Sequence, residues 1–449
     1  MKKKYSYWLD SGKYSMLQKL VMVLFGLLTF MLLARVFGDP EKFGIWGLFI
    51  VISSIVEMLR HALVKNGYIL FINTCEDRDR PGFEFAALLS NVIFTVILVV
   101  FFFLTGDLFE RTFHSKGMGI ILKYYAITLI FLLAFSHREF FLIARMDFKG
   151  MFFMYLIRNG VFLLVVSYLF FTRTSISPEV LAIYYGLSAV AGVIIGMVLG
   201  EKYSRLRMKW DRQIFIRFLN YGKFILGTNF FALVFRNTDS FIVARFISPA
   251  AVAFYNTSTR IINFAEIPVL VLSETMLPRA AQIIKTGDLS GMKNIYEKTV
   301  AAMLTLIIPF IIVASFFSKQ IILIIAGPEY LQAVPILNIM ILYCFFIPFT
   351  SQFGNTMDST GRASTNFVVN TVFALFNVAS NFFFIHHFGL IGSAYGTLLS
   401  YFLLFLTTQI LLSKLIGVSV LQIIKNIFEL YPEYLGIAKR YISKSLNSR

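Results

Sequence analysis

Apolar residues recur along this chain in runs of 18 or more, and short polar segments separate the runs. A helix of about 20 apolar residues is long enough to cross the ~30 Å hydrocarbon core of a membrane. The pattern predicts an all-α membrane protein with twelve transmembrane helices. The predicted spans are 16–37, 43–64, 84–104, 119–141, 151–171, 180–200, 224–247, 251–272, 298–317, 333–356, 364–385 and 389–413.

A weak internal repeat divides these spans into two sets of six. Several residues recur about 210 positions later, near half the chain: Gly12, Lys13, Ala34 and Arg35 as Gly222, Lys223, Ala244 and Arg245, and Pro40 and Glu57 as Pro249 and Glu266. Because six is even, both halves enter the membrane in the same sense, which predicts a pseudo-two-fold axis along the membrane normal. We therefore expect an N-terminal six-helix lobe (1–201), a cytoplasmic linker (202–223), a C-terminal six-helix lobe (224–413) and a cytoplasmic amphipathic tail (414–449), with a central cavity.

The distribution of charged residues along the chain, more than their number, indicates the membrane topology. Hydrophobic residues are 58% of the chain and charged residues 14%, with a net charge of +17. With the N-terminus inside, 28 Lys and Arg residues fall in predicted cytoplasmic segments and 7 in outside segments. This positive-inside bias predicts that both termini are cytoplasmic. The excess of basic residues is then explained by membrane topology and by attraction to anionic lipids, and not by nucleic-acid binding. We expect a multi-pass protein of a bacterial inner membrane.

The predicted span Phe224–Ile247 carries charge at its centre. Arg236, Asn237 and Asp239 lie there, and a central Arg costs roughly 2.5–3.5 kcal/mol on insertion scales. Such residues normally face water, a partner or a ligand. One interpretation is that Arg236 and Asp239, three positions apart, neutralise each other inside a tight bundle. The other is a polar cavity that receives a charged cargo.

Further polar residues share helix faces in the neighbouring predicted spans. Asn256, Arg260 and Asn263 fall on one stripe of the eighth span, and Asn370 and Asn377 belong to an asparagine row of the eleventh that also holds Asn366 and Asn381. In the first half, Lys123 and Arg158 are the candidate counterparts. The asparagine row has two interpretations, since amides both line cavities and join membrane helices. We predict that substrate binds in the cavity to Arg236, Asn237, Asp239, Asn256, Arg260, Asn263, Asn370, Asn377, Arg158 and Lys123.

A pathway lined by Arg and Asn favours an anionic, hydroxyl-rich cargo, because Arg binds phosphate bidentately and amides bind hydroxyl groups. The sequence holds no phosphate-binding glycine loop, nucleophile triad or metal-spaced His/Cys set. Its two cysteines, Cys75 and Cys344, lie far apart. We expect no catalytic residue, no metal and no cofactor.

Short motifs resemble the polysaccharide (lipid-linked oligosaccharide) flippase branch of the superfamily that includes multidrug and toxin extrusion transporters. They are Asn237–Asp239 followed by Ala253–Asn256, then Ala326–Tyr330, Asp358–Arg362 and Phe388–Ala394. The resemblance implies two lobes around a cavity that opens alternately to each side. It implies a polyprenyl-diphosphate-linked oligosaccharide as cargo, with Arg236 and Arg260 at the positions that meet the diphosphate or acidic sugars. Ala253 departs from the usual glycine.

Other functions predict different features. A cation-coupled drug exporter of the same fold needs an acid-rich, aromatic cavity, whereas Asp239 is the only central acid. A membrane glycan polymerase or ligase needs a large outside domain, and no outside loop is long. A structural scaffold would not need central charges. Besides the cargo and membrane lipid, glycosyltransferases and a polysaccharide polymerase are candidate partners. We expect the tail to place Leu421, Ile424, Ile427, Phe428 and Tyr431 on the inner membrane surface.

Overall fold

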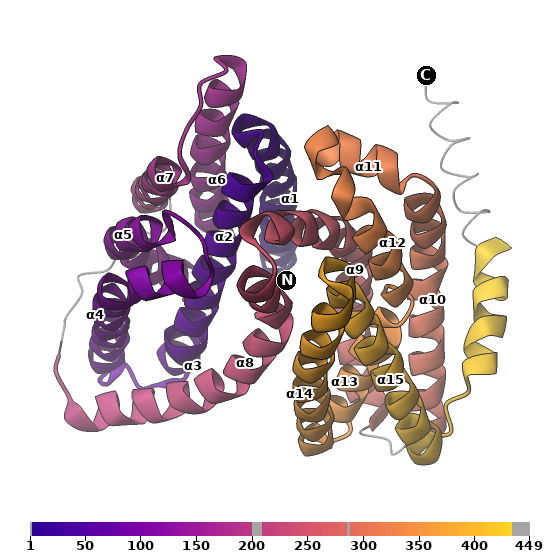
Figure 1. Ribbon diagram of the computed structural model, residues 1–449. Helices are drawn as coiled ribbons and strands as arrows, with labels where there is room; N and C mark the ends of the chain where they lie inside the picture. Colours follow the sequence, from indigo (N-terminus) through magenta and orange to yellow (C-terminus); the bar gives the residue numbers. More distant parts are fainter. Residues whose placement is uncertain (1, 200–208, 285–287, 433–449) are drawn as a thin grey trace, which may run out of the picture. The chain divides into compact units, whose positions relative to one another are not determined.

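The computed structural model describes residues 2–199, 209–284 and 288–432, without the side chains of 2–12, 224, 227–236, 274–282, 284 and 363. Every regular element in these described ranges is helical, as predicted (Figure 1). In chain order they are α1 (Lys2–Phe37), α2 (Pro40–Arg60), the π-helical η1 (His61–Lys65), α3 (Asn66–Thr74), α4 (Arg80–Thr112), α5 (Met118–Ala144), α6 (Phe148–Phe171), α7 (Pro178–Leu199), α8 (Arg212–Phe246), α9 (Pro249–Ile284), α10 (Leu289–Phe316), α11 (Ser318–Ile325), the 3-10 helix η2 (Pro328–Ala333), α12 (Val334–Tyr343), α13 (Ile347–Ser359), α14 (Ala363–Phe388) and α15 (Leu390–Ile416).

The described helices make this a multi-pass membrane protein. Within the described ranges, nine helices are long and apolar enough to cross a membrane, or ten if the pair Pro328–Tyr343 and Ile347–Ser359, bent by 44°, counts as one span. Both α8 and α9 coincide with predicted spans and have 35 and 36 residues, but they are not among these nine. The expectation of twelve spans stays a prediction.

The chain forms two compact units. Unit 1 comprises Met1–Ala253 with Ile324–Glu329, and unit 2 comprises Phe254–Leu323 with Tyr330–Arg449. In unit 1, α8 contacts α2, α3 and α4, and its first turns occupy residues 212–223 of the predicted linker. Of that linker, residues 202–208 lie outside the described residues. The predicted lobe boundaries stay a prediction.

Unit 1 packs its helices around an aromatic interior. Helix α5 contacts α4, α6 and α7, and α1 lies along α6 (Figure 1). Where α2 meets α5, α6 and α7, the rings of Phe49, Tyr125 and Tyr185 contact edge to face, with Phe49–Tyr125 centroids 5.2 Å apart. Aromatic pairs prefer this geometry because ring edges are positive and ring faces negative. The interior of unit 1 is thus well packed and positions the polar residues described below.

Aspartates begin several of the helices. The side chain of Asp39 accepts a hydrogen bond from the Glu41 amide (2.8 Å), Asp147 from Gly150 (2.8 Å) and Asp211 from Gln213 (2.8 Å). Such caps satisfy the first amides of a helix, which have no partner within it. Polar residues between the apolar runs therefore mark where the membrane helices start.

Unit 2 contains a tight hairpin of α14 and α15. The turn residue Gly389 has φ +58°, a conformation that favours glycine. A Cβ on Gly392 would overlap the carbonyl of Phe384, and one on Gly396 would lie 2.9 Å from the Cα of Asn381. The glycines of the motif 388–394 thus permit the close approach of two membrane helices.

The C-terminal helix, residues 420–432, does not present the single apolar face that we predicted. Ile423 and Ile427 are buried in the core of unit 2 with Met292 and Tyr296 of α10. Leu421 and Phe428, by contrast, are 73% and 72% exposed. Ile427 thus lies on the buried side and not on the predicted face, whereas Leu421, Ile424 and Phe428 are exposed. That this exposed face lies on the membrane surface stays a prediction.

Candidate functional site

The central residues of α8 and α9 are divided between the two units. Asn237 and Asp239 belong to α8 in unit 1, and Asp239 is only 7% exposed. Asn256 and Arg260 on α9 of unit 2 are half-buried, and Asn263 is exposed. The side chain of Arg236 lies outside the described residues. That these residues share one cavity therefore stays a prediction.

Arg158 is buried in unit 1 and pairs with an acid. Its Nη2 donates to Glu57 Oε1 (2.9 Å) and to the Tyr185 hydroxyl (3.0 Å). The guanidinium also lies 4.6 Å from the centre of the Phe135 ring. Because a carboxylate, a hydroxyl and an aromatic face already surround it, this guanidinium stabilises the packing of α2, α6 and α7. That Arg158 binds substrate stays a prediction.

Lys123 occupies a more exposed place. Its ammonium contacts Asp107 Oδ1 at 2.8 Å, and the two side chains are 35% and 68% exposed. The pair joins the last turns of α4 to the first turns of α5. Exposed pairs of this kind contribute little to stability. Lys123 and Arg158 thus lie in different surroundings within unit 1.

A buried polar cluster around η1 was not predicted as a site. Arg60, 1% exposed, donates to the hydroxyls of Ser136 (3.4 Å) and Thr95 (3.2 Å), and Asn91 also donates to Ser136 (3.2 Å). No partner for the Nε of Arg60 is present among the described residues. The sequence signal was an arginine within an apolar run, which is unusual enough in a membrane helix to suggest function.

The neighbouring carboxylate of Glu139 is enclosed by two bases from η1. His61 Nε2 lies 3.4 Å and Lys65 Nζ 3.3 Å from its oxygens, and the Glu139 side chain is 4% exposed. His61 and Lys65 face the same direction because they are four positions apart on the π-helical segment. Single π-helical turns occur frequently at functional sites. Unit 1 therefore contains paired charges in its interior, arranged by an irregular part of one helix.

The asparagine row of α14 separates into two pairs. Asn377 and Asn381 are buried, and Asn381 Nδ2 donates to the Asn377 carbonyl (3.1 Å) and to Thr397 Oγ1 of α15 (3.5 Å). Asn370 is exposed and donates to Asn366 (2.7 Å), which in turn donates to Asp358 (3.0 Å). The buried pair joins α14 to α15, whereas the second pair is accessible. The joining interpretation therefore holds for the buried pair, and a cavity-lining role for the row stays a prediction.

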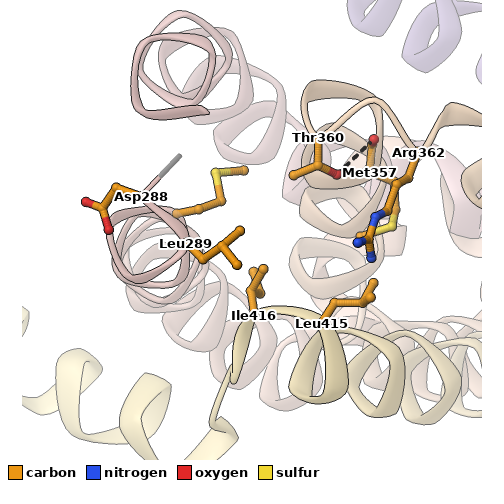
Figure 2. A pocket seen from close by; sticks show the side chains of 8 residues that line it. Asp288, Leu289, Met357, Thr360, Arg362, Leu415 and Ile416 are labelled. Atoms are coloured by element: carbon orange, nitrogen blue, oxygen red, sulfur yellow. Dashed lines mark hydrogen bonds between the residues drawn. The ribbon is translucent and has the colours of Figure 1, made fainter. Parts of the chain in front are cut away.

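Figure 2 shows a small pocket of unit 2, about 160 Å³ in volume, where α10 begins and α13 and α15 end. Arg362 lies on the side of the pocket near Leu415, opposite Leu289, and the Asp288 carboxylate points away. Asp288 instead caps α10, and hydrogen bonds from Gly291 and Ser290 lower the pKa of its carboxyl. The pocket is too small for an oligosaccharide. In the described part of the chain, no group of three or more His, Cys, Asp or Glu residues could hold a metal ion.

Comparison with known structures shows the fold. A lipid II flippase in an inward closed conformation matches with a TM-score of 0.76 and 14% identity, covering 94% of this chain and 92% of the flippase. An inward-facing multidrug resistance transporter of the MATE family matches with a TM-score of 0.75 and 12% identity, covering 88% of this chain and 95% of the transporter. At such identities the likeness concerns architecture.

Comparison of sequences shows the family. A candidate O-antigen transporter of Shigella flexneri is 24% identical over 46% of this chain and 51% of its own length. A probable low-salt glycan biosynthesis flippase of Haloferax volcanii is 20% identical over 48% of this chain and 46% of its own length. The chain thus spans about half the length of these curated relatives. The model of the polysaccharide biosynthesis protein family matches residues 32–335, well over half of the chain. The chain therefore belongs to the polysaccharide biosynthesis protein family, a family of membrane transporters and not of enzymes.

Proposed function

We propose that this protein is an alternating-access flippase that moves a polyprenyl-diphosphate-linked oligosaccharide from the inner to the outer leaflet for surface polysaccharide assembly. The family match over residues 32–335 is the observation that carries the proposal. In this proposal twelve spans form two six-helix lobes around a central cavity in a bacterial inner membrane, with both termini cytoplasmic. Glycosyltransferases and a polysaccharide polymerase supply and consume the cargo.

The polar residues of α8 and α9 support an anionic cargo. Arg260 provides a half-buried cation on a membrane helix, with Asn256 one turn before it and Asn263 three positions after it. A guanidinium can bind a diphosphate through two parallel hydrogen bonds, and amides bind sugar hydroxyls. In this proposal, Arg236, Asn237 and Asp239 complete the binding region, and Asn370, Asn377, Arg158 and Lys123 are further cavity candidates.

The test is Arg260→Ala in cells that depend on this protein for surface polysaccharide. We expect polysaccharide export to fall at unchanged protein level, and lipid-linked oligosaccharide to accumulate on the inner leaflet. Arg260→Lys should recover part of the export, since it retains charge without the bidentate geometry. Lys42→Ala, which removes an exposed cation near the start of α2, is the matched control. Normal export in Arg260→Ala would contradict the site, and drug resistance on overexpression would favour a drug exporter.

A further inference from the structure

Two adjoining pockets, one polar and one mostly apolar, lie at the end of unit 1 where a turn connects α6 to α7. One, of about 530 Å³, is lined by Arg35, Arg173, Thr174 and Ser175 together with Val36, Leu169, Phe170 and Phe171. The other, of about 460 Å³, is mostly apolar and is lined by residues of α6 and α7, among them Leu164, Tyr168, Val180 and Tyr184. Both share Leu169, Thr174 and Ser175. A polar pocket is therefore continuous with an apolar groove.

The polar pocket has the donors that a phosphate requires. Arg173 is exposed and has no carboxylate within ion-pair distance in the part of the chain that the structure describes. Arg35 of α1 lines the same pocket; its Nη1 donates to the carbonyls of Met31 (2.8 Å) and Ile325 (3.2 Å) and its Nη2 to that of Ile324 (2.5 Å), which hold the guanidinium at the pocket wall. The hydroxyls of Thr174 and Ser175 complete the lining. Arginine and hydroxyl groups are the side chains that recognise phosphate oxygens.

Arg173 has an unfavourable backbone conformation in the turn between α6 and α7. Its φ is +53°, in the left-handed region where few residues other than glycine are found. The turn itself is closed by hydrogen bonds from the amides of Arg173 to Phe170 O (3.3 Å) and of Thr174 to Leu169 O (3.1 Å). Glycine would serve this turn with less strain. An arginine here therefore points to a use for its side chain, since strained residues gather at functional sites.

The apolar groove is open to the bilayer along membrane helices. Leu164 and Tyr168 of α6 are 70% and 67% exposed, and Val180 and Tyr184 of α7 are 42% and 39% exposed. Tyrosine side chains are enriched where hydrocarbon meets headgroups. In addition, only 7 of the 41 basic residues fall in predicted outside segments, and two of those seven line this pocket.

We propose that this end of unit 1 binds a membrane lipid with a phosphate headgroup, its phosphate between Arg173 and Arg35 and its chain in the groove between α6 and α7. With the predicted orientation, the site faces the outer leaflet. Polyprenyl phosphates and anionic phospholipids share this chemistry. The site is separate from the proposed cargo residues of α8 and α9, and its test measures binding without transport.

The test is native mass spectrometry of the purified full-length protein in detergent, titrated separately with polyprenyl monophosphate, phosphatidylglycerol and inorganic phosphate. Arg173→Asn removes the charge but retains a residue that tolerates the turn, and we expect lipid affinity to fall about tenfold. Arg173→Lys should restore most of it. Leu164→Trp, which fills the groove, should weaken lipid binding. Arg111→Gln, at an exposed cation in the last turn of α4, is the matched control and should bind as the parent protein does.

The outcomes separate the possible occupants. Tighter binding of polyprenyl monophosphate than of phosphatidylglycerol would identify the carrier lipid, and equal binding would identify a general phospholipid site. Equal affinities for Arg173→Asn and Arg111→Gln would overturn the proposal, as would binding of inorganic phosphate alone. Elution of each variant as a single species on size exclusion, with Leu164→Trp as an independent variant, prevents misfolding from being read as lost binding.

Discussion

The guanidinium of Arg158 on α6 donates a 2.9 Å hydrogen bond to the carboxylate of Glu57 on α2, across 101 positions of sequence. The side chain of Arg158 is 9% exposed and that of Glu57 31% exposed. An ion pair with one buried partner adds little over an apolar replacement, but the loss of either partner leaves the other charge without compensation in a partly buried place. The pair therefore fixes how α2 and α6 pack in unit 1.

Removal of one partner should destabilise the protein more than removal of both. We expect Arg158→Met to lower the free energy of unfolding by about 1–3 kcal/mol, since the Glu57 carboxylate that loses its partner is only partly buried. The double variant Glu57→Gln with Arg158→Met should recover much of that loss. Thermal unfolding of the purified variants in detergent measures the difference. A double variant no more stable than Arg158→Met would show that the pair is not the reason for the loss.

Close helix packing at Gly392 predicts that a single methyl group is harmful there. We expect Gly392→Ala to lower the melting temperature, because its Cβ would overlap the Phe384 carbonyl of the opposite helix. Gly160→Ala in α6 is the matched control, since its Cβ would lie 3.5 Å from Phe25, an ordinary contact. Alanine is the better helix former by about 1 kcal/mol, so the control should be neutral or stabilising. Equal effects in both variants would contradict the close approach.

The two cysteines provide a test of topology and of pH dependence. Cys75 follows α3 and is partly exposed, whereas Cys344, between α12 and α13, is buried. Partial burial raises the pKa of the Cys75 thiol. Because the thiolate is the reactive form, labelling by a membrane-impermeant maleimide should accelerate as pH rises through and beyond the usual range of a thiol.

That labelling should occur in inverted membrane vesicles and not in intact cells, because the segment after α3 is predicted to be cytoplasmic. Cys75→Ser should abolish it under native conditions, and Cys344 should react only after unfolding. Labelling of Cys75 in intact cells alone would reverse the predicted orientation.

The C-terminal helix should contribute to stability through Ile423. This side chain is completely buried with Met292 and Tyr296, so Ile423→Ala should cost about 2–5 kcal/mol. Leu421→Ala, at a residue 73% exposed, should change stability by less than about 0.5 kcal/mol. Thermal unfolding followed by far-ultraviolet circular dichroism compares the two, because all three tryptophans of the chain lie in unit 1. Similar losses in both variants would indicate that the helix does not pack as described.

Hydropathy predicted the helical fold because a membrane requires its helices to be long, apolar and internally hydrogen bonded. The internal repeat also has structural counterparts. Ala34 and Ala244 are both 1% exposed, in the last turns of α1 and α8, and Pro40 and Pro249 each begin the helix that follows. The repeated residues thus occupy equivalent positions: the alanines are buried near helix ends, and the prolines begin helices.

The site was less predictable, because its partners are distant in sequence. Arg158 was expected in a cavity, and nothing in the sequence joined it to Glu57. Arg60 lies near the end of a predicted span, and its sequence position gives no link to the hydroxyls of α4 and α5 that surround it. The tail was predicted from its own periodicity, but contacts with α10 decide which of its faces is buried.

The π-helical turn of η1 is a feature in which relatives of this chain can differ. The amide of Asn66 bonds to the carbonyl of His61, five residues earlier, so this turn accommodates one residue more than an α-helical turn. A relative that lacks that residue would form an unbroken α-helix, with the faces of α2 and α3 still in phase. A one-position gap in an alignment at 61–65 would therefore mark the loss of the widened turn, and with it the presentation of His61 and Lys65 to Glu139.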